Sequence, residues 1–167
     1  MRYIPIIFFI FLFSFTVISC AKKSDSSSSS SANGSPGTYQ LATNDYANGV
    51  ATDSSGNVYV TGGTKGGLDG NTSAGNTDLF VIKYNSSGTK QWTKQLGSSG
   101  RDSANGVATD SSGNVYVTGV TYGGLDWNTS AGANDLFVVK YNSSGTKEWT
   151  KQLGSASSDF ANGVATD

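Results

Sequence analysis

The chain has 167 residues, a formal net charge of −1 and no histidine. A charge this close to zero gives no electrostatic attraction for nucleic acid, and the lack of histidine removes the most common general base and metal ligand. Glu148 is the single glutamate. We therefore expect a protein that is not an enzyme, with no catalytic residues, no metal site, no cofactor and no nucleic-acid partner.

Residues 1–19 have the pattern of a signal peptide for export. A short positive start at residues 1–3 is followed by an apolar run at residues 4–18. The run is shorter than the ~20 apolar residues that a stable membrane-spanning helix needs, and it has the length of the apolar region of a secretory signal. A plain signal peptide and an uncleaved anchor remain alternatives at this point.

Cys20 is the sole cysteine, so no disulfide can form within the chain. The residues before it, Val17-Ile18-Ser19, are aliphatic at −3 and small at −1, and this pattern resembles the bacterial lipobox. The resemblance implies that the signal peptide is removed and that Cys20 carries fatty acyl chains such as palmitate, which anchor a lipoprotein in a membrane. Each buried CH₂ of such a chain contributes about 0.8 kcal/mol to anchoring.

The segment after the cysteine predicts both a tether and a location. Residues 20–37 are rich in serine and cannot bury apolar surface, so we expect a disordered tether. Its length corresponds to a root-mean-square span of roughly 20–25 Å. Ala21 stands where an aspartate often signals retention at the inner membrane, which favours the outer membrane of the bacterial cell envelope.

Residues 38–167 contain an internal repeat with a period of 57 residues. Aligning residues 47–103 with 104–160 gives 46 identities in 57, and residues 47–53 recur again at 161–167. Self-similarity of this kind marks an architecture in which each copy is one supersecondary unit. We expect a first blade at about 46–98, a second at about 103–155 and a partial third at 159–167.

Each copy contains four segments with strand-like composition. In the first copy they lie at 49–53, 58–61, 78–84 and 89–96, with a long loop at 62–77. They are rich in β-branched and aromatic residues and are bounded by Gly, Asn and Ser. The first is made of small residues, the third is continuously apolar from Leu79 to Ile82 and the fourth carries Lys90 and Lys94, as expected of an inner, a doubly buried and an edge strand.

The repeat resembles a known family in two of its stretches. Residues 53–62 and 78–84, with Trp92 after them, are similar to the bacterial SBBP β-propeller repeat, and the second copy matches through 110–119, 135–141 and Trp149. The resemblance covers about residues 39–167. It implies an all-β fold of tandem four-stranded antiparallel blades on an exported protein, and it implies no catalytic site.

Two blades and the first strand of a third are fewer than the four to eight blades of a closed propeller. Three accounts are open: a truncated product of a longer gene, a ring assembled from several chains, and a small stack on the membrane. We expect the end faces to expose residues such as Phe80 and Ile82 or Phe137 and Val139, which would favour self-association.

Aspartates recur in the turns and loops of both copies. Asp53 and Asp110 begin turns that resemble parts of a calcium loop, but each offers one carboxylate where about six oxygen ligands are needed. We expect hydrogen bonds to the turn backbone instead. The loop and strand-start pairs recur in both copies, which favours a structural role over glycosidase chemistry; these pairs are Asp69 with Asp78 and Asp126 with Asp135.

The long loops are the best candidates for binding, because loops on a rigid scaffold commonly carry function. Between the copies they differ at Gly63/Val120, Lys65/Tyr122, Gly70/Trp127, Asn76/Ala133 and Thr77/Asn134. We predict that Tyr122, Trp127 and Lys65 contact a protein or glycan partner. The predicted function is a membrane-anchored, non-catalytic binding scaffold, and the alternative is a residual fragment with no function of its own.

Overall fold

The computed structural model describes residues 44–167. The signal peptide, Cys20 and the tether at 20–37 lie outside the described residues, so those predictions stay predictions. Within residues 44–167, no helix is long and apolar enough to pass through a bilayer.

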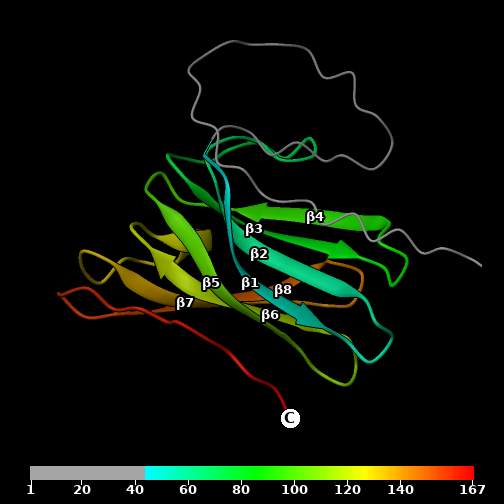
Figure 1. The fold of residues 1–167 in the computed structure, drawn as a ribbon. Helices are drawn as coiled ribbons and strands as arrows, with labels where there is room; N and C mark the ends of the chain where they lie inside the picture. The colour runs from blue at the N-terminus through cyan, green and yellow to red at the C-terminus, as the bar shows by residue number, and fades with distance from the viewer. Residues whose placement is uncertain (1–43) are drawn as a thin grey trace, which may run out of the picture. The chain divides into compact units, whose positions relative to one another are not determined.

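Two four-stranded antiparallel sheets make up the described fold, one for each copy of the repeat (Figure 1). The first sheet contains, in spatial order, β1 (Tyr46–Thr52), β2 (Val58–Thr64), β3 (Asp78–Tyr84) and β4 (Lys90–Leu96). The second contains β5 (Asp102–Thr109), β6 (Val115–Thr121), β7 (Asp135–Tyr141) and β8 (Lys147–Leu153). Each strand pairs with the next strand in the sequence, so each copy is a blade-like meander, and the predicted fold class is confirmed.

The first strand of each sheet begins earlier than the sequence predicts. Tyr46 and Ala47 pair with β2, and the register then shifts so that Asn48 is the extra residue of a β-bulge. The same shift occurs in β5 around Asn105. Alanine, asparagine and glycine have low β propensity, so pairing with the neighbouring strand, rather than local preference, extends this strand.

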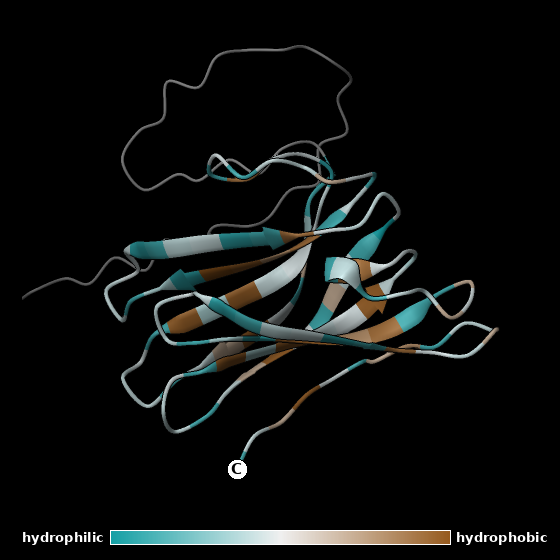
Figure 2. Cartoon of the chain, turned by 180° about the vertical axis from the view of Figure 1, so that it is seen from behind, coloured by the Kyte–Doolittle hydropathy of each residue, from teal (hydrophilic) through white to brown (hydrophobic). Residues whose placement is uncertain are grey.

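The main hydrophobic core lies between the two sheets. In β3, Leu79 and Val81 pack against the second blade. Trp92 packs against this core, and its ring centre lies 6.5 Å from that of Tyr141 in the second blade. The brown, hydrophobic stretches in Figure 2 fall mainly on the strands. The other buried members of the core are Tyr59, Ala104, Val107, Val115, Val117, Leu125, Phe137, Val139 and Tyr141.

The prediction that Phe80, Ile82, Phe137 and Val139 are exposed is wrong, because all four side chains are buried. Successive residues of a strand point to opposite faces, so Phe137 and Val139 face the first sheet and their neighbours in β7 face away. Phe80 and Ile82 form a second small cluster with Leu68. As predicted, β3 is buried on both faces. The half-buried positions are instead Leu136 and Val138 of the second blade, so the prediction of self-association now concerns that face.

The predicted first strand of a third blade, at 159–167, forms no ladder. A ladder requires a neighbouring strand, and none of the residues at 44–167 supplies one. The segment nevertheless follows β5: Asn105 Nδ2 donates to the Ala161 carbonyl (3.0 Å) and Thr166 Oγ1 donates to the Thr109 carbonyl (2.6 Å). One period earlier, Asn48 Nδ2 donates to Ala104 O (2.9 Å), so the segment lies on the second blade as β5 lies on the first.

Candidate functional site

Asp53 organises the turn between β1 and β2. Its Oδ1 accepts hydrogen bonds from the backbone N–H groups of Ser55 (2.9 Å) and Asn57 (3.0 Å), and its Oδ2 accepts from the Tyr59 hydroxyl (2.9 Å). Burial raises the pKa of Asp53, but these hydrogen bonds and one from the Asn57 side chain outweigh it, so the net shift is downward. The turn interpretation of this aspartate is confirmed, and Asp110 has the same set of bonds.

The loop aspartates are occupied by structural contacts. Asp69 pairs with Lys90, and its counterpart Asp126 pairs with Lys147. At the start of β3, Asp78 Oδ2 accepts from the Gln95 side chain (2.7 Å) and from a loop N–H group (2.8 Å). These contacts order the long loop, as expected from the recurrence of the same residues in both copies. In residues 44–167, no three His, Cys, Asp or Glu side chains gather where they could hold a metal ion.

Trp127 is the most prominent side chain of the second long loop. It ends the short helix η1 (Leu125–Trp127), its side chain is 100% exposed, and its backbone φ is 67°. The residues before it are fixed, because Leu125 is buried and its N–H donates to Gln152 Oε1 (2.8 Å). In the first blade the same position is Gly70, whose φ of 80° is easy for glycine.

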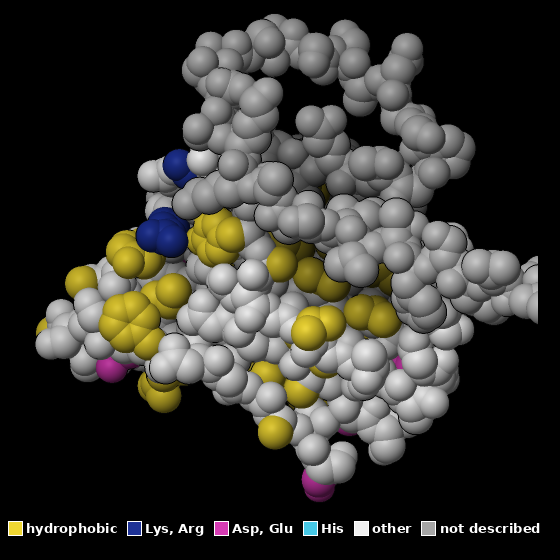
Figure 3. Space-filling view, in the orientation of Figure 1, with side chains coloured by type: hydrophobic (Ala, Val, Ile, Leu, Met, Phe, Trp, Pro, Cys, Tyr) yellow, Lys and Arg dark blue, Asp and Glu magenta, His cyan; other side chains and the backbone are white. Residues whose placement is uncertain are grey.

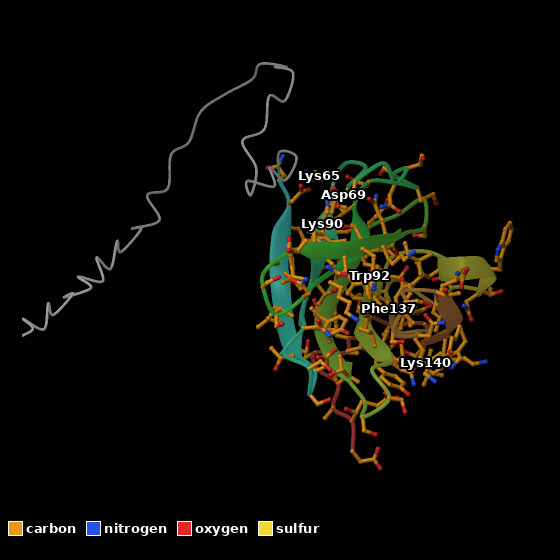
Figure 4. The ribbon with its side chains drawn as sticks, turned by 90° about the vertical axis from the view of Figure 1, so that its right-hand side faces the viewer. Lys65, Asp69, Lys90, Trp92, Phe137 and Lys140 are labelled. Carbon is orange, nitrogen blue, oxygen red and sulfur yellow. The ribbon has the colours of Figure 1, made fainter. Side chains whose placement is uncertain are left out.

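Lys65 and Tyr122 hold equivalent positions in the two blades and both adjoin Arg101. Lys65 is exposed and lines a cleft of about 290 Å³ with Tyr46, Asn76, Thr77 and Arg101. Tyr122 is 46% exposed, and its N–H donates to the Arg101 carbonyl (2.9 Å). Figure 4 shows Lys65 at one end of the first blade and η1 apart from it, so the structure brings two of the three predicted contact residues together and leaves Trp127 separate.

Two residues of this site were missed from the sequence. Arg101 lies at the end of the first copy, directly before β5, where its guanidinium donates to the Tyr46 hydroxyl (3.3 Å) and sits 6.0 Å from that ring's centre. The hydrogen bond from Arg101 to Tyr46 raises the pKa of Arg101 further above its ordinary value, so the charge is permanent. The available signal was a difference between copies, because Tyr46 aligns with Ser103 and Arg101 with Ser158, but both residues lie outside the long loop.

Comparison with known proteins gives one curated relative and one repeat family. Regulatory protein FlaEY of Caulobacter vibrioides is 28% identical over 128 residues, which is 68% of this chain and 13% of that protein. The chain therefore spans a small part of the relative's length. Residues 40–69 and 91–126 match the family model described as SBBP, beta-propeller repeat, and these two matches include β1, β2, β5, β6 and all but the first residue of β4. These two segments of the chain therefore match SBBP β-propeller repeats, as the sequence resemblance predicts.

Proposed function

We propose that this protein is a lipid-anchored, non-catalytic binding scaffold of the bacterial envelope, whose loops contact a protein or glycan partner. The observation that carries the proposal is that Trp127 combines a fully exposed side chain with a left-handed backbone conformation. A non-glycine residue in the left-handed region costs about 1–3 kcal/mol, and full exposure returns none of that cost through burial. A glycine would relieve the strain, as it does at position 70, so the folded chain alone gives no reason for a tryptophan there.

The contact role is tested by crosslinking in cells. A photo-crosslinking amino acid at position 127 is expected to give an adduct of discrete mass, and the same amino acid at position 70 of the first blade serves as the matched control. Trp127→Gly, which introduces the residue of the first blade, should leave the unfolding midpoint unchanged or higher while reducing partner binding. Equal or absent adducts at both positions would favour the alternative of a fragment without a partner.

The anchor has its own test, because it depends on the sequence resemblance alone. Cells fed a clickable palmitate analogue should label the wild-type chain and should not label Cys20→Ser, which also should leave the membrane fraction. Labelling of the Cys20→Ser protein would refute the lipobox assignment. The blades offer no second cysteine that could confuse the result.

A further inference from the structure

The cleft beside Lys65 is where the two copies of the repeat differ most. Although 46 of 57 aligned positions are identical, none of the five residues that line the cleft is retained in the second copy. The lining residues of the first blade are Tyr46, Lys65, Asn76, Thr77 and Arg101. Their counterparts 57 residues later are Ser103, Tyr122, Ala133, Asn134 and Ser158. Both sets support the same blade fold, so the fold does not require the first set.

Backbone pairing fixes the position of Arg101 next to the long loop. The N–H of Asn76 donates to the Gly100 carbonyl (3.0 Å), and the N–H of Asp102 donates to the Thr77 carbonyl (2.7 Å). Thr77 and Arg101 thus form an isolated parallel bridge. This places the loop residues and the arginine on the same small surface.

The second blade has the same bridge but uses its side chains differently. Asn134 and Ser158 form the bridge there, and Asn134 Nδ2 donates to Ser158 Oγ (3.2 Å). The polar groups at this place therefore satisfy each other. In the first blade the residue that bridges to Thr77 is Arg101, and its long cationic side chain keeps N–H donors available for a ligand.

Tyr46 and Gly63 form a matched pair that builds one wall of the cleft. A Cβ atom on Gly63 would lie 2.6 Å from the Tyr46 hydroxyl oxygen, so the tyrosine ring can occupy its place only over a glycine. The second copy has the reverse arrangement, with the small Ser103 beside Val120. The side-chain volumes at the two paired positions change together between the copies. The strands therefore form without this tyrosine wall, which belongs to the first blade alone.

The side chains that line the cleft include two cations, Lys65 and Arg101, and no acid. Neither Lys65 nor Arg101 forms an ion pair with a residue of the described part of the chain. Three carboxyl groups lie next to the lining residues: Asp45 accepts a hydrogen bond from the Lys65 backbone N–H (3.2 Å), and the buried Asp78 and Asp102 follow Thr77 and Arg101 in the sequence. On the face shown in Figure 3, Lys and Arg gather at the upper left, and Asp and Glu lie toward the lower part.

We infer that this cleft binds the carboxylate of an acidic sugar, such as a uronic acid residue of an envelope glycan. The planar fork of Arg101 matches a carboxylate, and its bond to Tyr46 uses one of five N–H donors. The Asn76 amide and the Tyr46 hydroxyl suit sugar hydroxyl groups, and the tyrosine offers an aromatic surface at the wall.

The size of the cleft agrees with this ligand class. A volume of about 290 Å³ is near the lower end of the range for ligand pockets, about 300–1,000 Å³, which suits one or two sugar residues. The inference names a ligand for the binding role proposed above and rests on that role, but it does not involve Trp127. Failure of one therefore does not imply failure of the other.

The test is titration of the purified full-length protein with digalacturonic acid, followed by isothermal calorimetry. The neutral disaccharide galactobiose and inorganic phosphate are the comparison ligands. Arg101→Ser and Tyr46→Ser/Gly63→Val introduce residues of the second blade, so both variants are expected to fold. Lys151→Gln removes an exposed lysine from β8 and is the matched control for loss of charge.

Saturable binding of digalacturonic acid, with no binding of galactobiose, is expected for the wild type and for Lys151→Gln. Arg101→Ser should weaken it by about tenfold or more, because a charge-assisted hydrogen bond is lost, and the double variant should weaken it without any change of charge. No saturable binding, equal affinity for phosphate, or an equal loss in Lys151→Gln would each overturn the inference. The Trp127→Gly variant should bind the acidic sugar as the wild type does, which separates this site from the loop contact.

Discussion

Asp53 and Asp110 accept the same four hydrogen bonds in two different surroundings. Each binds two backbone N–H groups of its turn, one asparagine side chain and one tyrosine hydroxyl. Tyr59, the partner of Asp53, is completely buried, whereas Tyr116, the partner of Asp110, is half-buried. The repeat thus provides a natural control for the effect of burial on one hydrogen bond.

Asp53→Ala should lower the free energy of unfolding by about 1–3 kcal/mol, because the buried Tyr59 hydroxyl loses its acceptor. Asp110→Ala should lower it less, since water can reach Tyr116. Urea denaturation of the two full-length variants checks the difference. Equal losses would mean that the turn backbone, rather than the tyrosine, accounts for the effect.

The aspartates also predict how stability depends on pH. Five carboxyl groups have a pKa below the ordinary value in the folded protein, so folding favours their charged form: Asp53, Asp69, Asp110, Asp126 and Asp135. Their contribution is present above the unfolded pKa of about 3.9 and is lost as the pH falls through the lower folded values. Burial raises the pKa of Asp102, which opposes the trend for one group. We expect unfolding midpoints that are flat above about pH 5 and fall at lower pH, and a midpoint that rises on acidification would contradict this.

At the scale of the element, the bulge in each inner strand directs an asparagine at the next repeat. Asn48 donates to Ala104 O and to Ser103 Oγ (3.2 Å), and Asn105 donates to Ala161 O. Thr109 Oγ1 likewise donates to Thr52 O (3.3 Å). Neighbouring inner strands are therefore joined by side chains rather than by a backbone ladder.

This arrangement predicts the hydrogen exchange of the last nine residues. The amides at 160–167 have no ladder partner and should exchange far faster than those of β6 and β7, although their side chains hold the segment against β5. The Asp159 amide donates to Asn134 O (2.9 Å) and should be slower than its neighbours. Exchange measured residue by residue by NMR checks the contrast, and protection of 160–167 at the level of β6 would contradict it.

At the scale of the whole molecule, the two near-identical sheets have unequal surroundings. The first sheet is covered by the second, so Leu79 is fully buried, whereas its counterpart Leu136 is half-buried. Leu96 is half-buried, and its counterpart Leu153 is 70% exposed. Equivalent residues therefore report directly on the contact between sheets.

Leu79→Ala should reduce stability by about 2–5 kcal/mol, in the range of buried leucine truncations. Leu136→Ala should reduce it by clearly less, because water already reaches part of that side chain. Denaturant unfolding of both full-length variants gives the comparison. A similar loss for the two would show that the sheets do not pack on each other through β3.

The sequence predicted the order and antiparallel pairing of the eight strands in the two blades, because each copy has clear turn residues and strand-like composition, but the further strand predicted at 159–167 forms no ladder. It did not predict which apolar residues are buried between sheets: Phe137 and Val139 lie on the face opposite to the one expected, and strand composition does not tell one face of β7 from the other. The cleft was predicted only in part. Lys65 was found by comparing the loops, whereas Tyr46 and Arg101 reach the cleft through strand and bridge contacts that only the fold provides.

The pairing of Tyr46 with Gly63 fixes where one repeat should be separated from the next in an engineered array. A module cut at residues 46–102 keeps Tyr46 with Gly63 and contains every residue that lines the cleft. If the cut were made one residue later, the tyrosine would belong to the preceding module. An array of 46–102 modules would then carry one cleft per blade and bind a polymeric sugar with increasing avidity. An array built from residues 103–159 would have the same architecture but would lack the clefts, so it should not bind the polymeric sugar.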